Sequence, residues 1–228
     1  MQHCCIKRIK LNTIKTIEEQ GNEHWTKTVE TPLNIERLAV SDEDKINQIE
    51  ALFAEIMMVM GLDLEDDSLK GTPYRVAKMY VKELFSGLKV ENKPSISTFE
   101  NKYNYQKLII EKDITLYSAC EHHFLPIVGK VHVGYISAGK VIGLSKINRI
   151  VKYYGKRPQV QERLTLQIAN ELKQQLNTES VIVIVDAKHL CVSMRGVEDT
   201  MSTTITEEYS GDFNDLAVRN RFTNLLKP

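Results

Sequence analysis

Apolar positions in the first part of the chain repeat with the period of a helix. After Ser41 and Asp42, either of which can cap a helix, apolar side chains return every three or four residues until Gly61 interrupts the pattern. A second helix is predicted to start at Thr72, as its cap, with Pro73 in the first helical position, where a missing N–H is tolerated. Two helices are therefore expected ahead of the main domain.

Alternating and β-branched apolar runs replace the helical period from residue 107 onward. Gly139 marks an expected hairpin turn between two of these runs. Strands are predicted over residues 107–118, 127–136, 141–144, 181–185 and 203–208, and helices over 145–154, 160–176 and 214–225. Leading helices followed by strands with inserted helices predict an α+β fold.

The pattern divides the chain into three parts. Residues 1–40 show no sustained period, and Pro32 disfavours helical geometry in the residue before it, so we expect a loosely attached, flexible arm. Within it, the adjacent Cys4 and Cys5 are expected to be ordinary thiols, with lipidation and redox chemistry as alternatives. The other two parts are an N-terminal helical region at 41–106 and the main domain at 107–228.

The composition is that of an ordinary globular protein. The 228 residues are 42% hydrophobic and 26% charged, which fits one substantial domain and excludes a disordered chain, a coiled coil or a small disulfide-rich protein. The 30 basic and 30 acidic side chains balance, which argues against a dedicated nucleic-acid binder. No apolar run reaches the roughly 18 residues of a membrane helix. Because residues 1–10 carry no apolar signal segment, a cytoplasmic protein with reduced cysteines is expected.

Positive charge is concentrated between residues 122 and 170. This stretch holds eight Lys and Arg side chains and a single acid, Glu162. Lys146 and Arg149 are three residues apart in the expected first turn of a helix, and Ser145 at the expected cap adds a hydroxyl. Cations are unfavourable at a helix start, where the dipole attracts anions. A phosphate-bearing ligand would explain them, and a solvated surface is the alternative.

Glu162, the lone acid, has two interpretations. Its carboxylate offers two adjacent acceptors, which match the N1–H and 2-amino donors of guanine. An ion pair with Arg163 or Arg149 on the helix surface is the simpler interpretation of the same residue.

Cysteine and histidine occur together at two places. Residues 120–123 read Cys-Glu-His-His and contain Cys-x-x-His, which is half of a zinc site, while Cys191 follows His189 by two residues and offers a third ligand. Two cysteines, one histidine and a water form a catalytic zinc arrangement, which lowers the pKa of the water to about 7. His122 and His189 would then be proton-transfer groups beside the metal. Burial of these residues without a metal is the alternative.

Five long segments follow one another along the chain. They read Gly-Thr-Pro-Tyr-Arg-Val-Ala-Lys-Met at 71–79, Cys-Glu-His-His-Phe at 120–124, Val-Ile-Gly-Leu-Ser-Lys-Ile-Asn-Arg at 141–149, Arg-Pro-Gln-Val-Gln-Glu-Arg-Leu at 157–164 and Cys-Val-Ser-Met-Arg-Gly-Val at 191–197. Together they resemble the signature segments of the GTP cyclohydrolase I family, a far more specific likeness than one short motif. The resemblance covers about residues 42–226 and leaves the arm outside it.

The resemblance implies the tunnelling fold: an antiparallel four-stranded sheet with two helices packed on it, here with the N-terminal helical region added. The sheets of several subunits would form a barrel, in a homodecamer of two face-to-face pentamers with active sites at subunit interfaces. The catalytic domain, residues 107–228, would convert GTP and water to formate and 7,8-dihydroneopterin triphosphate. This reaction opens tetrahydrofolate or tetrahydrobiopterin biosynthesis. The implied partners are GTP and further copies of the chain, with no nucleic acid and no membrane.

The resemblance also assigns side chains to three tasks. The ligands of one Zn²⁺ per subunit would be Cys120, His123 and Cys191. The catalytic residues would be His189 as proton donor to N7 of the purine, His122 as a second acid/base, and Ser145 in the later sugar rearrangement. Glu162 would bind guanine, against the ion-pair interpretation, with Gln161 helping to bind the base. The triphosphate would contact Lys146, Arg149, Arg195 and Arg75.

Two departures and two rival interpretations accompany this assignment. Ser137 stands where the family often has proline, and Lys152, Lys156 and Arg157 have no expected ligand contact, so we expect them on a solvated surface.

One rival is a pterin- or purine-binding oligomer that has lost catalysis, and the other is a nitrile reductase of the same fold that uses a cysteine nucleophile and NADPH. The intact Cys and His set favours the metal enzyme. Loss of activity on chelation and indifference to NADPH would distinguish the two enzymes.

Overall fold

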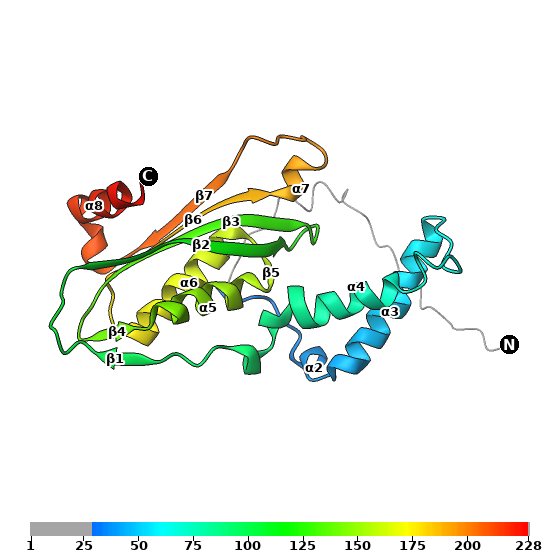
Figure 1. Ribbon diagram of the computed structural model, residues 1–228, viewed down its shortest axis with the longest axis horizontal. Coiled ribbons are helices and arrows are strands. Elements are labelled where there is room, and N and C mark those ends of the chain that lie inside the picture. The colour runs from blue at the N-terminus through cyan, green and yellow to red at the C-terminus, as the bar shows by residue number, and fades with distance from the viewer. Residues whose placement is uncertain (1–28, 228) are drawn as a thin grey trace, which may run out of the picture.

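The helices and strands of the computed structural model, which describes residues 29–227, follow the expected order with several additions (Figure 1). The α-helices are α2 (Ile35–Leu38), α3 (Asp42–Val59), α4 (Thr72–Met79), α5 (Leu144–Gly155), α6 (Gln161–Leu176), α7 (Leu190–Ser193) and α8 (Leu216–Leu226). The strands are β1 (Thr98–Glu100), β2 (Leu108–Cys120), β3 (Pro126–Ile136), β4 (Lys140–Ile142), β5 (Pro158–Gln159), β6 (Val181–His189) and β7 (Thr204–Tyr209). The fold is α+β, as predicted.

The main sheet has the strand order β5-β2-β3-β6-β7. The last four of these pair antiparallel, which confirms the predicted four-stranded sheet, and β5 adds two residues parallel to the end of β2. Among the described residues no strand pairs with the outer edge of β7, and the outer edge of β2 is paired only where β5 meets it. Both edges of the sheet are therefore largely open.

Helices α5 and α6 cover one face of this sheet, and their apolar side chains form the main core with the inward residues of β2, β3 and β6. Helix α8 packs on the opposite face, at the end of the sheet away from α7 (Figure 1). There the ring of Phe222 lies directly on Gly134, where a Cβ would stand only 2.7 Å from the ring. None of the described helices combines the length and apolar character needed to cross a membrane.

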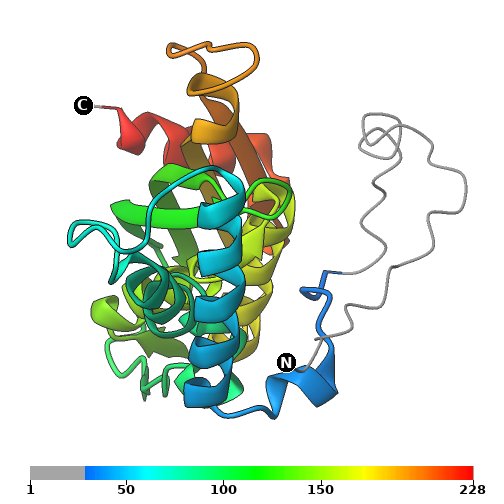
Figure 2. The same cartoon turned by 90° about the vertical axis from the view of Figure 1, so that its right-hand side faces the viewer.

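The N-terminal helical pair, α3 and α4, lies toward the α7 end of the molecule (Figures 1 and 2). Ser41 caps α3 by accepting a hydrogen bond from the Asp44 N–H, as predicted. The second helix differs from the prediction, because Gly71 rather than Thr72 is its cap residue, with no side-chain cap bond. After Met79 it continues as a π-helical turn, Tyr80–Leu84.

The predicted hairpin at Gly139 is wrong. Gly139 does turn the chain, with a φ of +115°, but β4 pairs antiparallel with β1 and not with β3. The three-residue strand β1 was not predicted, since so short a segment shows no clear alternation. The predicted strand 181–185 is also longer in the structure and runs on to His189.

The expected loose attachment of the arm does not hold for its last residues. Thr31 is buried, and its hydroxyl accepts hydrogen bonds from Arg157 Nη1 at 3.5 Å and Gln167 Nε2 at 3.4 Å. Gln167 Nε2 also donates to the carbonyl of Val29 at 2.8 Å. Residues 29–31 are thus held against α6. Cys4 and Cys5 lie outside the described residues.

Arg157 corrects a second expectation, since it lies in the interior rather than on a solvated surface. It is 8% exposed, and its Nε donates to the carbonyl of Gly87 at 2.8 Å. Its guanidinium carbon lies 4.6 Å from the ring centre of Tyr153 and 4.7 Å from that of Tyr154, so cation–π contacts take the place of water.

His132 lies on the sheet face opposite α5 and α6 and is held in its neutral form. Its Nδ1 accepts a hydrogen bond at 3.1 Å from the N–H of Asp113, which sits at a bulge of β2. Lys130 donates to the Asp113 carboxylate at 2.8 Å. Burial lowers the pKa of His132, and the charge of Asp113 opposes this only in part.

Acidification is therefore expected to destabilise the fold through His132. Because the folded pKa lies below the unfolded value of about 6.5, the unfolded chain takes up a proton first, and the free energy of unfolding falls as the pH drops through about 6.5. His132→Asn, whose side-chain oxygen can replace Nδ1 as acceptor, should lose stability less steeply. Urea unfolding of both proteins between about pH 7.5 and pH 5 makes the comparison, and equal slopes would contradict the prediction.

Candidate functional site

The predicted metal ligands meet at one end of the sheet, where β2 and β6 both terminate. Backbone pairing places Ala119 opposite Pro126 and Ile127 opposite His189, so the last residues of β2 and β6 flank the start of β3. Cys120 is the last residue of β2, and Cys191 lies two residues past His189 in the short helix α7. Sequence positions about 70 residues apart are thereby brought together through strand register.

Cys120, His123 and Cys191 form a group that can hold a metal ion. Their ligand atoms all lie within 4.8 Å of one another. Cys120 is 5% exposed, and its Sγ lies 3.9 Å from His123 Nδ1. His122 Nδ1 lies 3.6 Å from the same sulfur, so both histidines of the motif border Cys120. Two thiols and one imidazole suit zinc, which prefers sulfur and nitrogen ligands.

The Cys191 thiol needs a compensating positive charge before it can lose its proton at neutral pH. Burial, followed by the nearness of Cys120, raises the pKa of Cys191 to about 11. Without a compensating charge the Cys191 thiol therefore holds its proton at neutral pH. A divalent metal removes this penalty, because it binds the thiolate form and displaces the proton. Arg195 adds positive charge beside the group, with Nη1 3.1 Å from His123 Nε2.

His189 is held by Gln161, the first residue of α6. The Gln161 side chain is 2% exposed, and its Nε2 faces the carbonyls of Val185 and Thr204 at 3.1 and 2.8 Å and the Thr206 hydroxyl at 3.2 Å. Its Oε1 therefore faces His189 Nε2, at 2.7 Å. Since an amide oxygen only accepts, the hydrogen sits on Nε2 of His189.

This arrangement has two consequences for the site. Burial lowers the pKa of His189, and the charge of Glu162 opposes this in part, so the ring tends to be neutral near pH 7. Gln161, expected to help bind a base, has its amide engaged inside the protein. Its contact with the site is the hydrogen bond to His189.

Glu162 is exposed in the first turn of α6, beside the buried Gln161. The simpler interpretation of Glu162 as a partner of Arg163 is wrong, because Arg163 turns the other way and pairs with Glu121. No ion pair joins Glu162 to Arg149 within residues 29–227 either. Its carboxylate is therefore available to a ligand.

Ser145, Lys146 and Arg149 lie elsewhere in the chain. Helix α5 begins beside β4, at the opposite end of the sheet from α7 (Figure 1). The 13 residues of β2 span about 40 Å, so one chain does not bring this group to the metal ligands. Ser145 is not the cap, which is Gly143, and Arg149 lies in the second turn rather than the first.

The basic side chains of this region have few partners. Lys146 Nζ donates to the carbonyl of Ser95 at 2.9 Å. Arg149 lines a pocket of about 310 Å³ together with Lys152 and Lys156. Arg75 lies outside this region, at the start of α4. It is exposed and donates to the Ser68 carbonyl at 3.4 Å and to the Thr72 hydroxyl at 3.1 Å.

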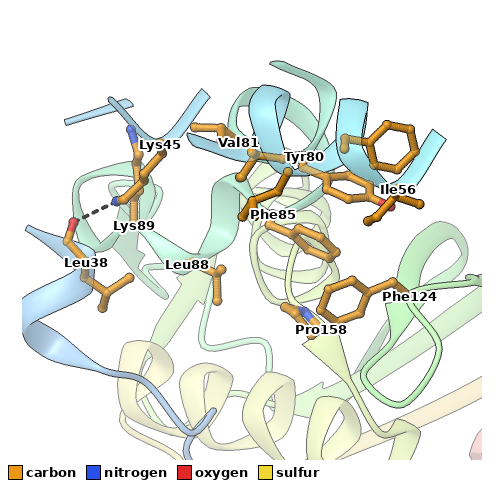
Figure 3. A pocket seen from close by; sticks show the side chains of 13 residues that line it. Leu38, Lys45, Ile56, Tyr80, Val81, Phe85, Leu88, Lys89, Phe124 and Pro158 are labelled. Atoms are coloured by element: carbon orange, nitrogen blue, oxygen red, sulfur yellow. Dashed lines mark hydrogen bonds between the residues drawn. The ribbon is translucent and has the colours of Figure 1, made fainter. Parts of the chain in front are cut away.

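A larger, apolar pocket of about 520 Å³ lies between α3, the π-helical turn and Phe124 (Figure 3). Phe124 is the residue after the Cys-Glu-His-His motif, and it has a left-handed φ of 55°. Its ring packs 5.2 Å from that of Phe85 and 6.4 Å from that of Tyr80. The loop that carries the metal ligands is therefore fastened to the N-terminal helical region by an aromatic cluster.

Comparison with known proteins gives a consistent result. The family described as GTP cyclohydrolase I matches residues 49–227. A GTP cyclohydrolase 1 of Flavobacterium johnsoniae is 50% identical over 217 residues, covering 95% of this chain and 97% of the relative. Those of Vibrio parahaemolyticus and Edwardsiella ictaluri are 49% and 52% identical, covering 87% and 81% of this chain and 91% and 83% of theirs. Among solved structures, the archaeosine synthase QueF-Like in the apo form matches 46% of this chain and 93% of its own at 21% identity, with a TM-score of 0.39.

Replacement of Cys191 by serine should remove the metal. A hydroxyl is a much poorer zinc ligand than a thiolate, so the loss of zinc affinity should exceed the roughly 10–100-fold typical of changes outside the ligand set. Zinc content after dialysis against a weak chelator measures this, with Cys5→Ser as a control for the cysteine-to-serine change. A Cys191→Ser protein that keeps the zinc content of the wild type would contradict the ligand assignment.

Proposed function

The chain belongs to the GTP cyclohydrolase I family and acts on GTP, and from this premise we propose that its Cys120–His123–Cys191 group is the zinc centre of the reaction. The reaction converts GTP and water to formate and 7,8-dihydroneopterin triphosphate. The observation that carries the proposal is the convergence of these three ligands with His189 and Glu162 at one end of the sheet. Zinc held by two thiolates and an imidazole keeps a position for water and lowers the pKa of that water to about 7.

His189 moves protons at its Nδ1. Gln161 holds the other ring nitrogen, Nε2, at 2.7 Å and fixes the orientation of the ring. The neutral ring can take up a proton at Nδ1 and return it to N7 of the purine as the imidazole ring of guanine opens. His122, next to the ligand Cys120, is the second acid/base.

Glu162 selects guanine. Its exposed carboxylate offers two adjacent acceptors to the N1–H and 2-amino donors of the base. Adenine does not present this pair of donors, and the carboxylate, once covered by that base, would be left unpaired at a cost in binding energy. Because Glu162 follows Gln161 directly, the first turn of α6 sets the distance between the bound base and His189.

The triphosphate is bound by cations from two chains. Arg195 lies at the metal end, whereas Lys146, Arg149 and Ser145 lie near the opposite end of the sheet. One site can include both groups only if neighbouring subunits contribute them. This supports an oligomer whose active sites lie at subunit interfaces. We take the oligomer to be a homodecamer of two pentamers whose sheets form a barrel, with Ser145 acting in the sugar rearrangement at the interface site.

Formate release from GTP should depend on the metal. Protein stripped with a chelator should release no formate above background, and stoichiometric zinc should restore release, because no side chain of the site replaces the metal as activator of water. NADPH should have no effect. Undiminished release from stripped protein would refute the zinc centre as proposed, while no release from metal-loaded protein would refute the assignment of these residues to the reaction.

The shared site predicts complementation between inactive variants. Cys191→Ser disables the metal end and Lys146→Glu the phosphate end, so a randomly assembled equal mixture should regain intact sites at about a quarter of interfaces. Formate release from co-expressed, differently tagged chains measures this. Cys191→Ser with His189→Ala, both at the metal end, is the matched control and should stay inactive. Equal activity of the two mixtures would contradict the shared site.

A further inference from the structure

Glu121 lies inside the metal-binding motif but does not face the metal group. It stands between Cys120 and His122, and its carboxylate turns toward α6. There it accepts two hydrogen bonds from Arg163, one from Nη1 to Oε2 at 2.5 Å and one from Nη2 to Oε1 at 3.3 Å. This two-pronged geometry is the strongest form of a carboxylate–guanidinium pair.

The pair is buried on the arginine side. The Arg163 side chain is 5% exposed and that of Glu121 is 20% exposed. Arg163 Nε has no hydrogen-bond partner among the described residues, so Glu121 is the group that balances the buried charge. A buried arginine without its acid is strongly unfavourable, so Glu121 is drawn toward α6.

The turn that carries the ligands needs such a contact. Two backbone hydrogen bonds close this turn. The Phe124 N–H donates to the Cys120 carbonyl at 2.8 Å, and the Cys120 N–H donates to the Leu125 carbonyl at 2.8 Å. The left-handed φ of Phe124 is uncommon for a bulky residue and persists only where the surroundings impose it. Glu121 also donates its N–H to the Gln159 carbonyl at 3.0 Å, and its Oε1 lies 4.0 Å from Nε2 of His122.

We propose that Arg163 is a positioning residue for the metal. By holding Glu121, it keeps Cys120 and His123 turned toward Cys191 before the metal arrives, and so raises metal affinity without touching the metal. The inference rests on the proposed zinc centre. It assigns to Arg163 a task separate from its neighbours in α6, of which Gln161 orients His189 and Glu162 is exposed to substrate.

The chain offers a matched comparison on the same helix. Glu171 of α6 is also an acid in a partly buried ion pair, with Lys93 Nζ at 2.7 Å, and it accepts a hydrogen bond from the Tyr154 hydroxyl at 2.8 Å. It does not contact the metal loop. Glu121→Gln and Glu171→Gln are therefore the same chemical change in two partly buried pairs, and only the first alters the proposed support of the metal.

The experiment measures zinc affinity of the metal-free protein by competition with a chromophoric chelator. Glu121→Gln and Arg163→Lys, which keeps the charge but loses the two-pronged geometry, should each weaken zinc binding roughly 10–100-fold. The double variant should be no weaker than the worse single variant, because both changes remove one interaction. Glu171→Gln should keep wild-type affinity even where its thermal midpoint falls. The absorption of bound Co²⁺ should shift in the first two variants and not in the control.

The outcomes separate the two proposals. Unchanged zinc affinity in Glu121→Gln would overturn the positioning role, as would equal weakening in Glu171→Gln. If Arg163→Lys does not fold, Glu121→Gln still decides the question. Wild-type protein that binds no zinc would refute the zinc centre, and with it this inference. Wild-type protein that binds zinc as tightly as its variants would refute the inference alone.

Discussion

The antiparallel register of β2, β3 and β6 is the constraint on which the whole site depends. It sets Ile127 opposite His189 and brings the end of β2, with Cys120, beside the start of β3. A slip of one residue would turn each side chain to the other face of the sheet. The register is secured by alternating valines of β3 and β6 that are fully buried against α5 and α6. The chemistry at the strand ends therefore depends on apolar packing along the whole length of the sheet.

The first turn of α6 converts this arrangement into a site. Three consecutive side chains have three different surroundings. Gln161 contacts His189, Glu162 is exposed, and Arg163 contacts the metal-binding loop. Because a helical turn is rigid, their relative positions change little. The other end of the sheet carries Lys146 and its neighbours, so in the shared site proposed above a single chain holds two halves of different sites. Oligomer formation would then be a requirement of catalysis rather than an addition to it.

Much of this could be predicted from the sequence, and the exceptions have physical reasons. The helix after Ser41 and the helix α6 have strong local signals, a cap and a sustained apolar period, and both were predicted nearly to the residue. The metal group could be predicted because Cys-x-x-His is a local motif and a third ligand needs only another cysteine.

The rest depends on contacts between distant parts of the chain. Strand β1 is ordered by β4, some 40 residues later, and the burial of Arg157 depends on two tyrosines and the Gly87 carbonyl. The tertiary structure likewise determines that Arg163 pairs with Glu121 rather than with Glu162. The sequence signal for this pairing was Glu121, an acid placed between two predicted metal ligands.

The open outer edges of β7 and β2 bear on how much of the enzyme a cell can maintain. Within the part of the chain that the structure describes, a subunit that has folded alone presents rows of unpaired N–H and C=O groups, which favour aggregation and attract proteases. If other copies cover these edges, assembly and stability both rise with concentration, because association is governed by mass action. Halving the synthesis of the chain would then lower the amount of assembled protein by more than half. For a protein built this way, a change in gene dosage would produce a proportionally larger change in the amount of assembled enzyme.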